Sequence, residues 1–446
     1  MRSKKRDLTA GPVKNVIRDL TIPMIFGILG MVIFNLVDTF YVGKLGTVQM
    51  AALSFTFPVV LVVNSINLGL GIGASAVISK AVGENNKEKV TRLSTDSLTL
   101  GFLVAAVLAL IGELTIHPLF ISLGADNEVL PYINEYMRVW YAGVPFVVIP
   151  MIGNNAIRAL GDTKTPSAVM MISALINMVL DPILIFGWGP FAAMGVKGAA
   201  VATVIARGIT FMVALYVLTV REKVIEIKLI KIRLLLSSWG KILFIGMPNA
   251  IAKVIIPIGA GIITRIISSF GHDYVAAFGI STRIEYFSLA ILSALAAIIP
   301  VYVGQNFGGK KMGRIKEGIK ISTRFSMVYS VIVYGLLFFL ARPLSHIFTE
   351  ESHVSDLIVL YLRIVPLGYG FQGILLIING ALNALGKPIK AALLNVVQML
   401  IIYVPLSVLF SNTYGMKGIF ISLIISYLVT GILARLMFNK ELSRIL

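Results

Sequence analysis

The sequence contains no cysteine, so neither a disulfide framework nor a cysteine-ligated metal centre is open to it. Charged residues are also scarce, at 13% of the chain, whereas a soluble domain carries about 25%. Because 57% of the residues are hydrophobic, a soluble fold would lack the polar side chains to cover its surface. These shortages exclude a soluble nucleic-acid-binding domain, even though the net charge of +18 favours such a partner.

Long apolar runs are present instead, for example at 98–111, 325–340 and 396–410. A helix needs about 20 mostly apolar residues to cross the hydrocarbon core of a bilayer. The weak alternation of a membrane β-barrel is absent. The sequence therefore predicts an all-α membrane protein with twelve transmembrane helices, at about 16–43, 51–82, 93–118, 134–160, 166–188, 194–219, 236–269, 275–304, 318–342, 357–384, 388–411 and 416–437.

Lysine and arginine divide the predicted loops into two sets. The opposite loops hold few cations, and the cation-rich loops lie near 2–6, 87–92, 158–164, 221–233, 310–320, 387–390 and 440–444. Because cations concentrate in cytoplasmic loops, we predict a multi-pass protein of the cell membrane with both termini in the cytoplasm.

Sequence patterns of the first half of the chain recur in the second half at a nearly constant offset. Ala51-Ala52 returns as Ala276-Ala277, and we align the loop at 83–85 with 304–306. The repeat predicts two six-helix bundles of the same topology, as in transporters that alternate access by rocking. We expect a tail at 1–15, an N-terminal lobe at 16–220, a basic linker at 221–235 and a C-terminal lobe at 236–446.

Few acids lie within the predicted spans. Asp38 and Asp181 lie about five and seven residues before the outer ends of their helices, at nearly the same depth. Asn35 and Asn177 share faces with them, and Thr203 reaches a similar depth in the sixth span. These oxygen ligands suit a hard cation such as Na⁺, or a carboxylate that binds a proton. A structural polar cluster that holds the helices together is the alternative.

The repeat favours a functional role for the two acids. The positions that correspond to Asp38 and Asp181 are Ile263 and about Tyr403, so the second bundle lacks both carboxylates. A cluster that only packed helices would be needed in both halves. Pro23 and Pro182 lie in the helices that carry the acids and are candidate gating kinks, although either kink can also be static.

The second bundle carries two charged residues deep in its spans. Lys253 and Glu285 each lie in mid-span, and we expect them to pair, because a lone buried charge is costly. Arg283 is a competing partner for Glu285. The pair has a structural and a substrate-facing interpretation, and both stay open.

Three segments carry a resemblance to a known family. They are Asn35-Leu36-Val37-Asp38, the run from Asn177 to Asp181-Pro182, and the run 198–203. Over essentially the whole chain the sequence resembles the multidrug and toxic compound extrusion (MATE) family, and within it the prokaryotic DinF-like branch. The resemblance implies two six-helix lobes arranged in a V and a prokaryotic cell membrane.

The resemblance also implies roles for individual residues. Asp38, Asn177, Asp181 and Thr203 match the family's cation site in the N-terminal lobe, which takes H⁺ or Na⁺. Asn35, Tyr136 and Asn154 match positions that line the cavity of that lobe. The NorM-like branch has coupling acids on helices 7 and 10 instead. Here helix 7 has Lys253, and helix 10 offers only Gln372 and Asn379, which argues against that second site.

The function implied is that of a secondary active antiporter, which exports organic cations or amphipathic drugs in exchange for H⁺ or Na⁺. No Walker A, HExxH or Ser/His constellation is present, so we expect neither ATP use nor an enzyme. We expect no cofactor beyond the coupling ion, no nucleic acid, and a monomer that contacts small molecules and membrane lipid. A flippase of a lipid-linked precursor is the alternative; it would need cations for a pyrophosphate, such as Lys253, Arg265 and Arg283.

Overall fold

The computed structural model describes residues 7–188, 191–226 and 232–445, apart from the side chains of some residues between 34 and 51, among them Asn35 and Asp38. In these ranges every regular element is a helix. The elements are α1 (Val13–Gly43), α2 (Thr47–Gly83), α3 (Lys87–Ser122), α4 (Leu130–Ala159), α5 (Lys164–Phe186), α6 (Gly195–Tyr216), η1 (Val217–Arg221), α7 (Ile232–Ser268), α8 (His272–Gly308), α9 (Met312–Phe348), α10 (Ser352–Ile364), η2 (Val365–Gly368), α11 (Tyr369–Ala384), α12 (Pro388–Val396), η3 (Val397–Tyr403) and α13 (Val404–Ile445).

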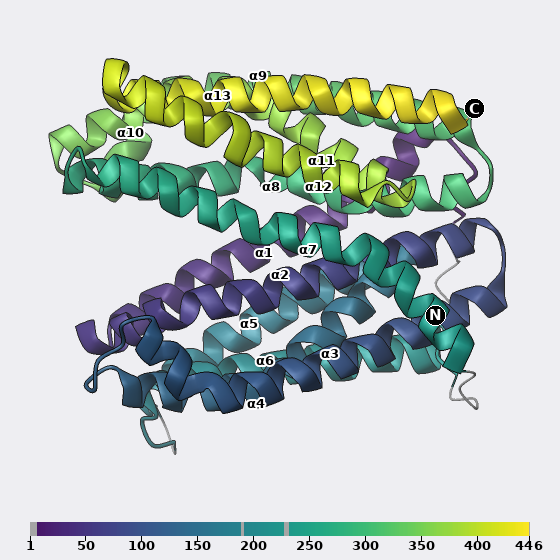
Figure 1. Cartoon of the computed structure of the whole chain (residues 1–446), viewed down its shortest axis with the longest axis horizontal. Helices are drawn as coiled ribbons and strands as arrows, with labels where there is room; N and C mark the ends of the chain where they lie inside the picture. The colour runs from purple at the N-terminus through teal and green to yellow at the C-terminus, as the bar shows by residue number, and fades with distance from the viewer. Residues whose placement is uncertain (1–6, 189–190, 227–231, 446) are drawn as a thin grey trace. The chain divides into compact units, whose positions relative to one another are not determined.

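Eleven helical segments in the described part of the chain are long and apolar enough to cross a membrane. The last of them, Pro388–Ile445, has 58 residues, which at about 1.5 Å per residue is nearly three times the thickness of the hydrocarbon core. Its helical geometry breaks at Gly415, whose φ of 56° and ψ of −139° lie outside the helical region. The ribbon of this segment reverses direction along its length (Figure 1), so the segment supplies the last two of the twelve predicted spans.

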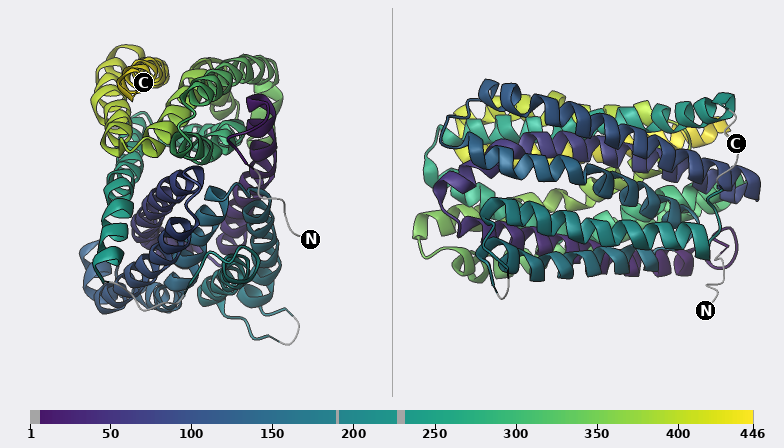
Figure 2. Two further views of the ribbon diagram at one scale, coloured as in Figure 1. Left: turned by 90° about the vertical axis from the view of Figure 1, so that its right-hand side faces the viewer. Right: turned by 90° about the horizontal axis from the view of Figure 1, so that it is seen from below.

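The chain divides into two compact units. The N-lobe comprises Ile22–Ala250, and the C-lobe comprises Leu8–Thr21 together with the residues from Ile251 onward. Within each lobe the long helices lie side by side with their axes roughly aligned (Figures 1 and 2). The divisions therefore fall inside α1 and α7, not at the predicted linker of 221–235.

Close packing explains why the first half of α7 belongs to the N-lobe. A side chain at Gly69 or Gly73 of α2 would overlap the backbone of α7 at Gly246 or Ile242, so these glycines let the two helices touch. On the other side of the lobe, Trp239 Nε1 of α7 donates a hydrogen bond to the backbone oxygen of Asp96 on α3, at 2.9 Å.

Polar contacts attach the start of the chain to the C-lobe. Arg314 of α9 donates to the carbonyl oxygen of Gly11 at 2.7 Å, and Lys311 donates to that of Thr9 at 2.8 Å. Asn306 Nδ2 donates to the carbonyl oxygen of Leu8 at 3.2 Å. Residues that precede the first span are therefore anchored to helices far along the sequence.

The internal repeat is visible in the backbone. Gly195 and Gly415 both have a φ of 56°, and Asn85 and Lys310 both have a φ of 55°. The turns at these positions form the same hydrogen bonds, for example Asn85 N to Val82 O and Lys310 N to Phe307 O. The loop at 83–85 thus corresponds to 308–310, and the predicted alignment with 304–306 was wrong, because a glycine shared by both segments misled it.

One helix of the repeat differs between the lobes. In the N-lobe α4 is continuous through Pro145 and Pro150. The equivalent stretch of the C-lobe is split into α10 and α11 by the 3₁₀ segment η2, which contains Pro366. Proline removes a backbone donor, which accounts for the tighter turn at this point.

Candidate functional site

A cavity of about 40 Å³ lies in the N-lobe between α5 and α6. By the same measure one water needs about 10–15 Å³, so the cavity can hold a few waters or one small polar group. Its walls combine two methionines with polar side chains, namely Met31, Met170, Ser173, Asn177, Thr203 and Arg207.

Close contact between α5 and α6 brings the polar wall of the cavity together. A side chain at Gly198 would overlap the carbonyl oxygen of Leu184, so only glycine lets the hairpin close this tightly. Asn177 Nδ2 then donates to Thr203 Oγ1 at 3.4 Å, and Ser173 Oγ donates to the carbonyl oxygen of Ala206 at 3.2 Å. The structure thus joins two of the four residues predicted for the cation site.

Asp181 lies one helical turn beyond Asn177 on α5 and is completely buried. Together with Asn177 Oδ1, which accepts no hydrogen bond within the described residues, it offers oxygens of the kind that a Na⁺ ion or a proton prefers. The side chains of Asp38 and Asn35 lie outside the described residues, so the four-residue site at Asp38, Asn177, Asp181 and Thr203 stays a prediction.

The two predicted kink prolines lie in unbroken helices. α1 continues through Pro23 and α5 through Pro182. Just after Pro23, the side chain of Met24 accepts a hydrogen bond from Ser167 Oγ at 3.4 Å. A gating movement at either proline stays a prediction.

Tyr136 and Asn154 lie on α4 but are 18 residues apart, about 27 Å along the helix. Neither lines the cavity between α5 and α6. Tyr136 packs against the N-lobe core, and Asn154 is half-buried. Their assignment to a substrate cavity stays a prediction.

Arg207 is the residue of this site that the sequence did not predict, because only acids were taken as candidates in the spans of the N-lobe. It lies in the helical stretch Gly195–Arg221, twelve residues from its start, which places it about 18 Å into the span. An arginine within an apolar run indicates a cavity or a partner, because ionisable residues inside a membrane normally face one or the other. The sequence could therefore have identified Arg207 as a site residue.

The C-lobe carries a second buried polar group, built around Glu285 of α8. Tyr427 donates to Glu285 Oε1 at 2.7 Å, and Tyr361 donates to Glu285 Oε2. No ion pair joins Glu285 to Lys253 in the part of the chain that the structure describes, so the predicted pair does not form. Arg283 is not a partner of Glu285 either. Two tyrosines on distant helices satisfy the carboxylate instead.

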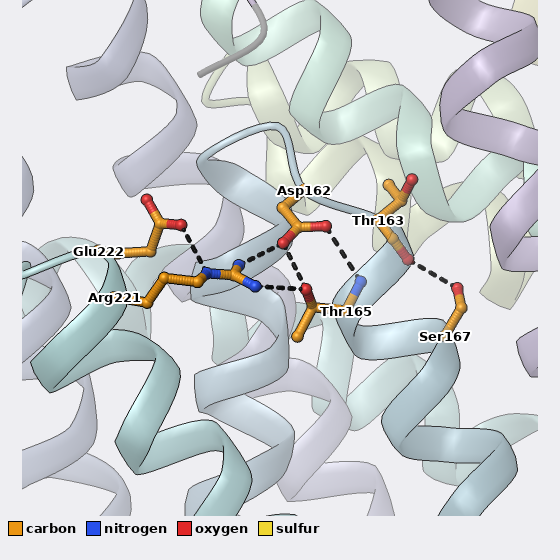
Figure 3. A network of polar contacts seen from close by, with 6 residues as sticks. All are labelled: Asp162, Thr163, Thr165, Ser167, Arg221 and Glu222. Carbon is orange, nitrogen blue, oxygen red and sulfur yellow. Dashed lines mark hydrogen bonds and ion pairs between the residues drawn. The ribbon is translucent and has the colours of Figure 1, made fainter. Parts of the chain in front are cut away.

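A further polar network holds α5 to the end of the α6–η1 stretch (Figure 3). Arg221 forms an ion pair with Asp162 and donates to Thr165 Oγ1 at 2.9 Å. Asp162 Oδ1 accepts the backbone N–H of Thr165 at 3.0 Å, which satisfies a free donor at the start of α5. Arg221 also pairs with Glu222 at 3.0 Å.

Two bundles of spanning helices, a repeat with matched turns and a polar cavity inside one bundle define a membrane transporter architecture. The family model MatE matches residues 23–183 and 248–409, so the chain belongs to the MATE family of transporters. Those two ranges are its two repeats.

Individual relatives agree with this assignment over nearly the full length. The chain is 34% identical to a FAD transporter of Shewanella oneidensis, over 96% of this chain and 95% of the relative. It is 26% identical to the multidrug export protein MepA of Staphylococcus aureus, over 93% and 91% of the two chains. Among solved structures, it is similar to the MATE transporter VcmN of Vibrio cholerae in its bent form, with a TM-score of 0.90, 29% identity and 97% of both chains covered.

Proposed function

We propose that the chain is an antiporter that exports organic cations or amphipathic drugs in exchange for H⁺ or Na⁺. The observation that carries the proposal is the buried carboxylate of Asp181 beside the Asn177–Thr203 contact in the N-lobe. A carboxylate enclosed in a spanning helix is costly unless it serves an ion or a partner. The relative MepA of S. aureus is a multidrug export protein, which supports the export direction.

In this proposal the coupling ion binds at the level of Asp181. Asp38 is expected to reach the same depth from α1, and Asn177 and Thr203 orient the carboxylates. A protonated carboxylate loses its charge, and a bound Na⁺ compensates it, so either ion changes the electrostatics of the N-lobe cavity. Export follows by alternating access, in which ion binding and cargo binding exclude each other, so that the incoming ion displaces the cargo.

A second cargo is favoured by one observation. The FAD transporter of S. oneidensis is 34% identical to the chain, against 26% for the multidrug export protein MepA. A flavin dinucleotide carries a pyrophosphate and is an anion, unlike the dyes that multidrug exporters move. The flippase alternative also involves a pyrophosphate, in that case attached to a lipid.

The test is ion-driven efflux from proteoliposomes with separately imposed H⁺ and Na⁺ gradients. Asp181→Asn and Asp38→Asn keep the side-chain shape but remove the charge, and each should abolish gradient-driven efflux while the protein still inserts. Asn177→Ala should weaken the coupling, because an amide only tunes the site.

Asp96→Asn is the matched control, since Asp96 is a second buried carboxyl of the N-lobe, on α3 and outside the cavity. It should leave the ion dependence unchanged. Full efflux by the Asp38→Asn, Asp181→Asn double variant would refute coupling at these residues and leave a structural cluster as the explanation.

A further inference from the structure

Arg207 places a positive charge near the middle of a spanning helix. It lines the N-lobe cavity next to Ser173, Asn177 and Thr203, and all three neighbours are neutral. An arginine at this depth is costly unless an anion or water compensates its charge. The remaining question is what supplies the negative charge.

No hydrogen bond or ion pair reaches Arg207 from the residues that the structure describes. Asp181 is not close enough to serve, because it lies one turn outward of the Asn177–Thr203 contact while Arg207 lies one turn inward. Those two turns separate the residues by about 12 Å along the antiparallel helices. Arg221 of the same lobe, by contrast, is paired with Asp162.

The C-lobe has a buried polar pair at the position that corresponds to Arg207. Gly195 and Gly415 have the same backbone conformation, and together they fix the alignment of α6 with α13. In that alignment Tyr427 occupies the place of Arg207, and Tyr427 donates its hydroxyl to the buried carboxylate of Glu285. The turns at Asn85 and Lys310 fix the alignment of α2 with α8, in which the N-lobe has Val60 where the C-lobe has Glu285. The C-lobe therefore supplies an acid of its own at this position, whereas the aligned residue of the N-lobe, Val60, carries no charge.

We propose that Arg207 binds an anionic phosphate or pyrophosphate group of the transported cargo, within the cavity between α5 and α6. The inference rests on the proposed transport function and names its substrate class. Guanidinium binds phosphate with two parallel hydrogen bonds, and the hydroxyl of Thr203, which accepts from Asn177, provides a further donor beside it. The cavity accepts one such group, and the remainder of the cargo lies outside it.

Two sources share this chemistry, a soluble dinucleotide and a pyrophosphate-linked lipid. FAD is the probe for the first source, and a fluorescent polyprenyl pyrophosphate added to the vesicles is the probe for the second. Riboflavin has the flavin ring without phosphate, and ethidium is a cation. Flux of each probe is measured in proteoliposomes under an imposed ion gradient, with FAD binding in detergent followed by flavin fluorescence.

Arg207→Met removes the charge at similar length and should lower flux of the phosphate-bearing probe by about 10- to 100-fold, the value of a charged hydrogen bond. Arg207→Lys keeps the charge but not the paired donors and should lose less. Ethidium flux should change little in both variants. Arg435→Met is the matched control, a half-buried arginine of α13 in the other lobe, and it should leave FAD flux unchanged.

Each outcome separates this inference from the function on which it rests. Loss of FAD flux alone, or of lipid flux alone, supports the anion site and identifies the source. Equal loss of ethidium and FAD in Arg207→Met would mean that the arginine only supports the fold, which overturns the inference. Ethidium export without flux of either phosphate probe by the unmodified protein also overturns it and leaves the antiporter proposal standing. Flux of none of the probes would remove the proposed function itself.

Discussion

The two lobes share their backbone turns but place opposite chemistry at equivalent positions. Where the N-lobe joins its fifth helix to the end of its sixth through Asp162 and Arg221, the C-lobe uses Lys387 and Lys390 with Glu441. The alignment that pairs Asn85 with Lys310 also pairs Asp162 with Lys387, and the one that pairs Gly195 with Gly415 also pairs Arg221 with Glu441. Equivalent positions therefore form an ion pair in both lobes, with the acid and the base exchanged.

The interiors of the lobes differ in the same way. The C-lobe encloses a carboxylate with hydroxyl donors, and the N-lobe encloses a guanidinium with amide and hydroxyl neighbours. The C-lobe group is complete within the protein, because Tyr361 and Tyr427 satisfy both oxygens of Glu285. The N-lobe group lines a cavity of about 40 Å³. The comparison indicates that the duplicated backbones were kept while their buried polar groups diverged.

The largest expected effect tests the shared backbone. Gly198→Ala and Gly418→Ala should each destabilise the protein by about 3 kcal/mol, because the new carbon would overlap the carbonyl oxygen of Leu184 or of Phe410. The measurement is the melting temperature in detergent. Gly208→Ala and Gly335→Ala are the controls, since open space surrounds both and alanine favours helix. A lobe that tolerated its substitution would not close its hairpin as the structure shows.

The second prediction concerns the complete polar group of the C-lobe. Tyr427→Phe should cost about 1–3 kcal/mol, because it removes a donor from a buried carboxylate. In a Glu285→Gln background the same change should cost less, and a double-mutant cycle measures the difference. Additive effects would show that the tyrosine and the carboxylate do not interact.

The Glu285→Gln variant of that cycle also tests whether the two lobes differ in ion coupling. Glu285→Gln should leave ion-driven efflux per inserted molecule in place, whereas Asp181→Asn in the N-lobe should remove it. Loss of the ion dependence in Glu285→Gln would move the coupling site into the C-lobe and reverse the comparison.

The sequence predicted the helices, their number and the repeat, because apolar run length and turn glycines are local signals. Depth along a helix is local as well, so the proximity of Asn177 and Thr203 could be foreseen from their distances to the helix ends. The predicted boundary between the spans at 388–411 and 416–437 agrees with the break at Gly415, where glycine adopts a positive φ between two apolar runs.

The sequence did not predict which side chains on different helices contact each other. Glu285 and Lys253 share a depth, but depth does not fix the rotation of a helix about its axis. The donors that reach Glu285 lie 76 and 142 residues further along the chain, at Tyr361 and Tyr427. Arg207 was overlooked because buried cations were considered only in the second bundle, although a cation in a span of the first bundle needs a partner just as strongly.

The smallest expected effect tests the ion pairs whose acid and base are exchanged between the lobes. Asp162 and its partner Arg221 are partly exposed, with 16% and 29% of their side chains accessible, so the pair is worth about 1 kcal/mol. Asp162→Lys should destabilise by that amount through repulsion from Arg221. Adding Arg221→Glu restores attraction with the polarity of the C-lobe, and thermal unfolding should recover.

Recovery in the N-lobe should stay incomplete. Asp162 also accepts the backbone N–H of Thr165 at the start of α5, a role that lysine cannot take and that is worth about 1 kcal/mol. The matched exchange in the C-lobe, Lys390→Glu with Glu441→Lys, has no such cap to lose, but it buries a lysine at a position where only 1% of the side chain is exposed. We therefore expect partial rescue in both lobes for different reasons. An N-lobe double variant no more stable than Asp162→Lys alone would show that Asp162 acts through the helix start and that the ion pair contributes nothing.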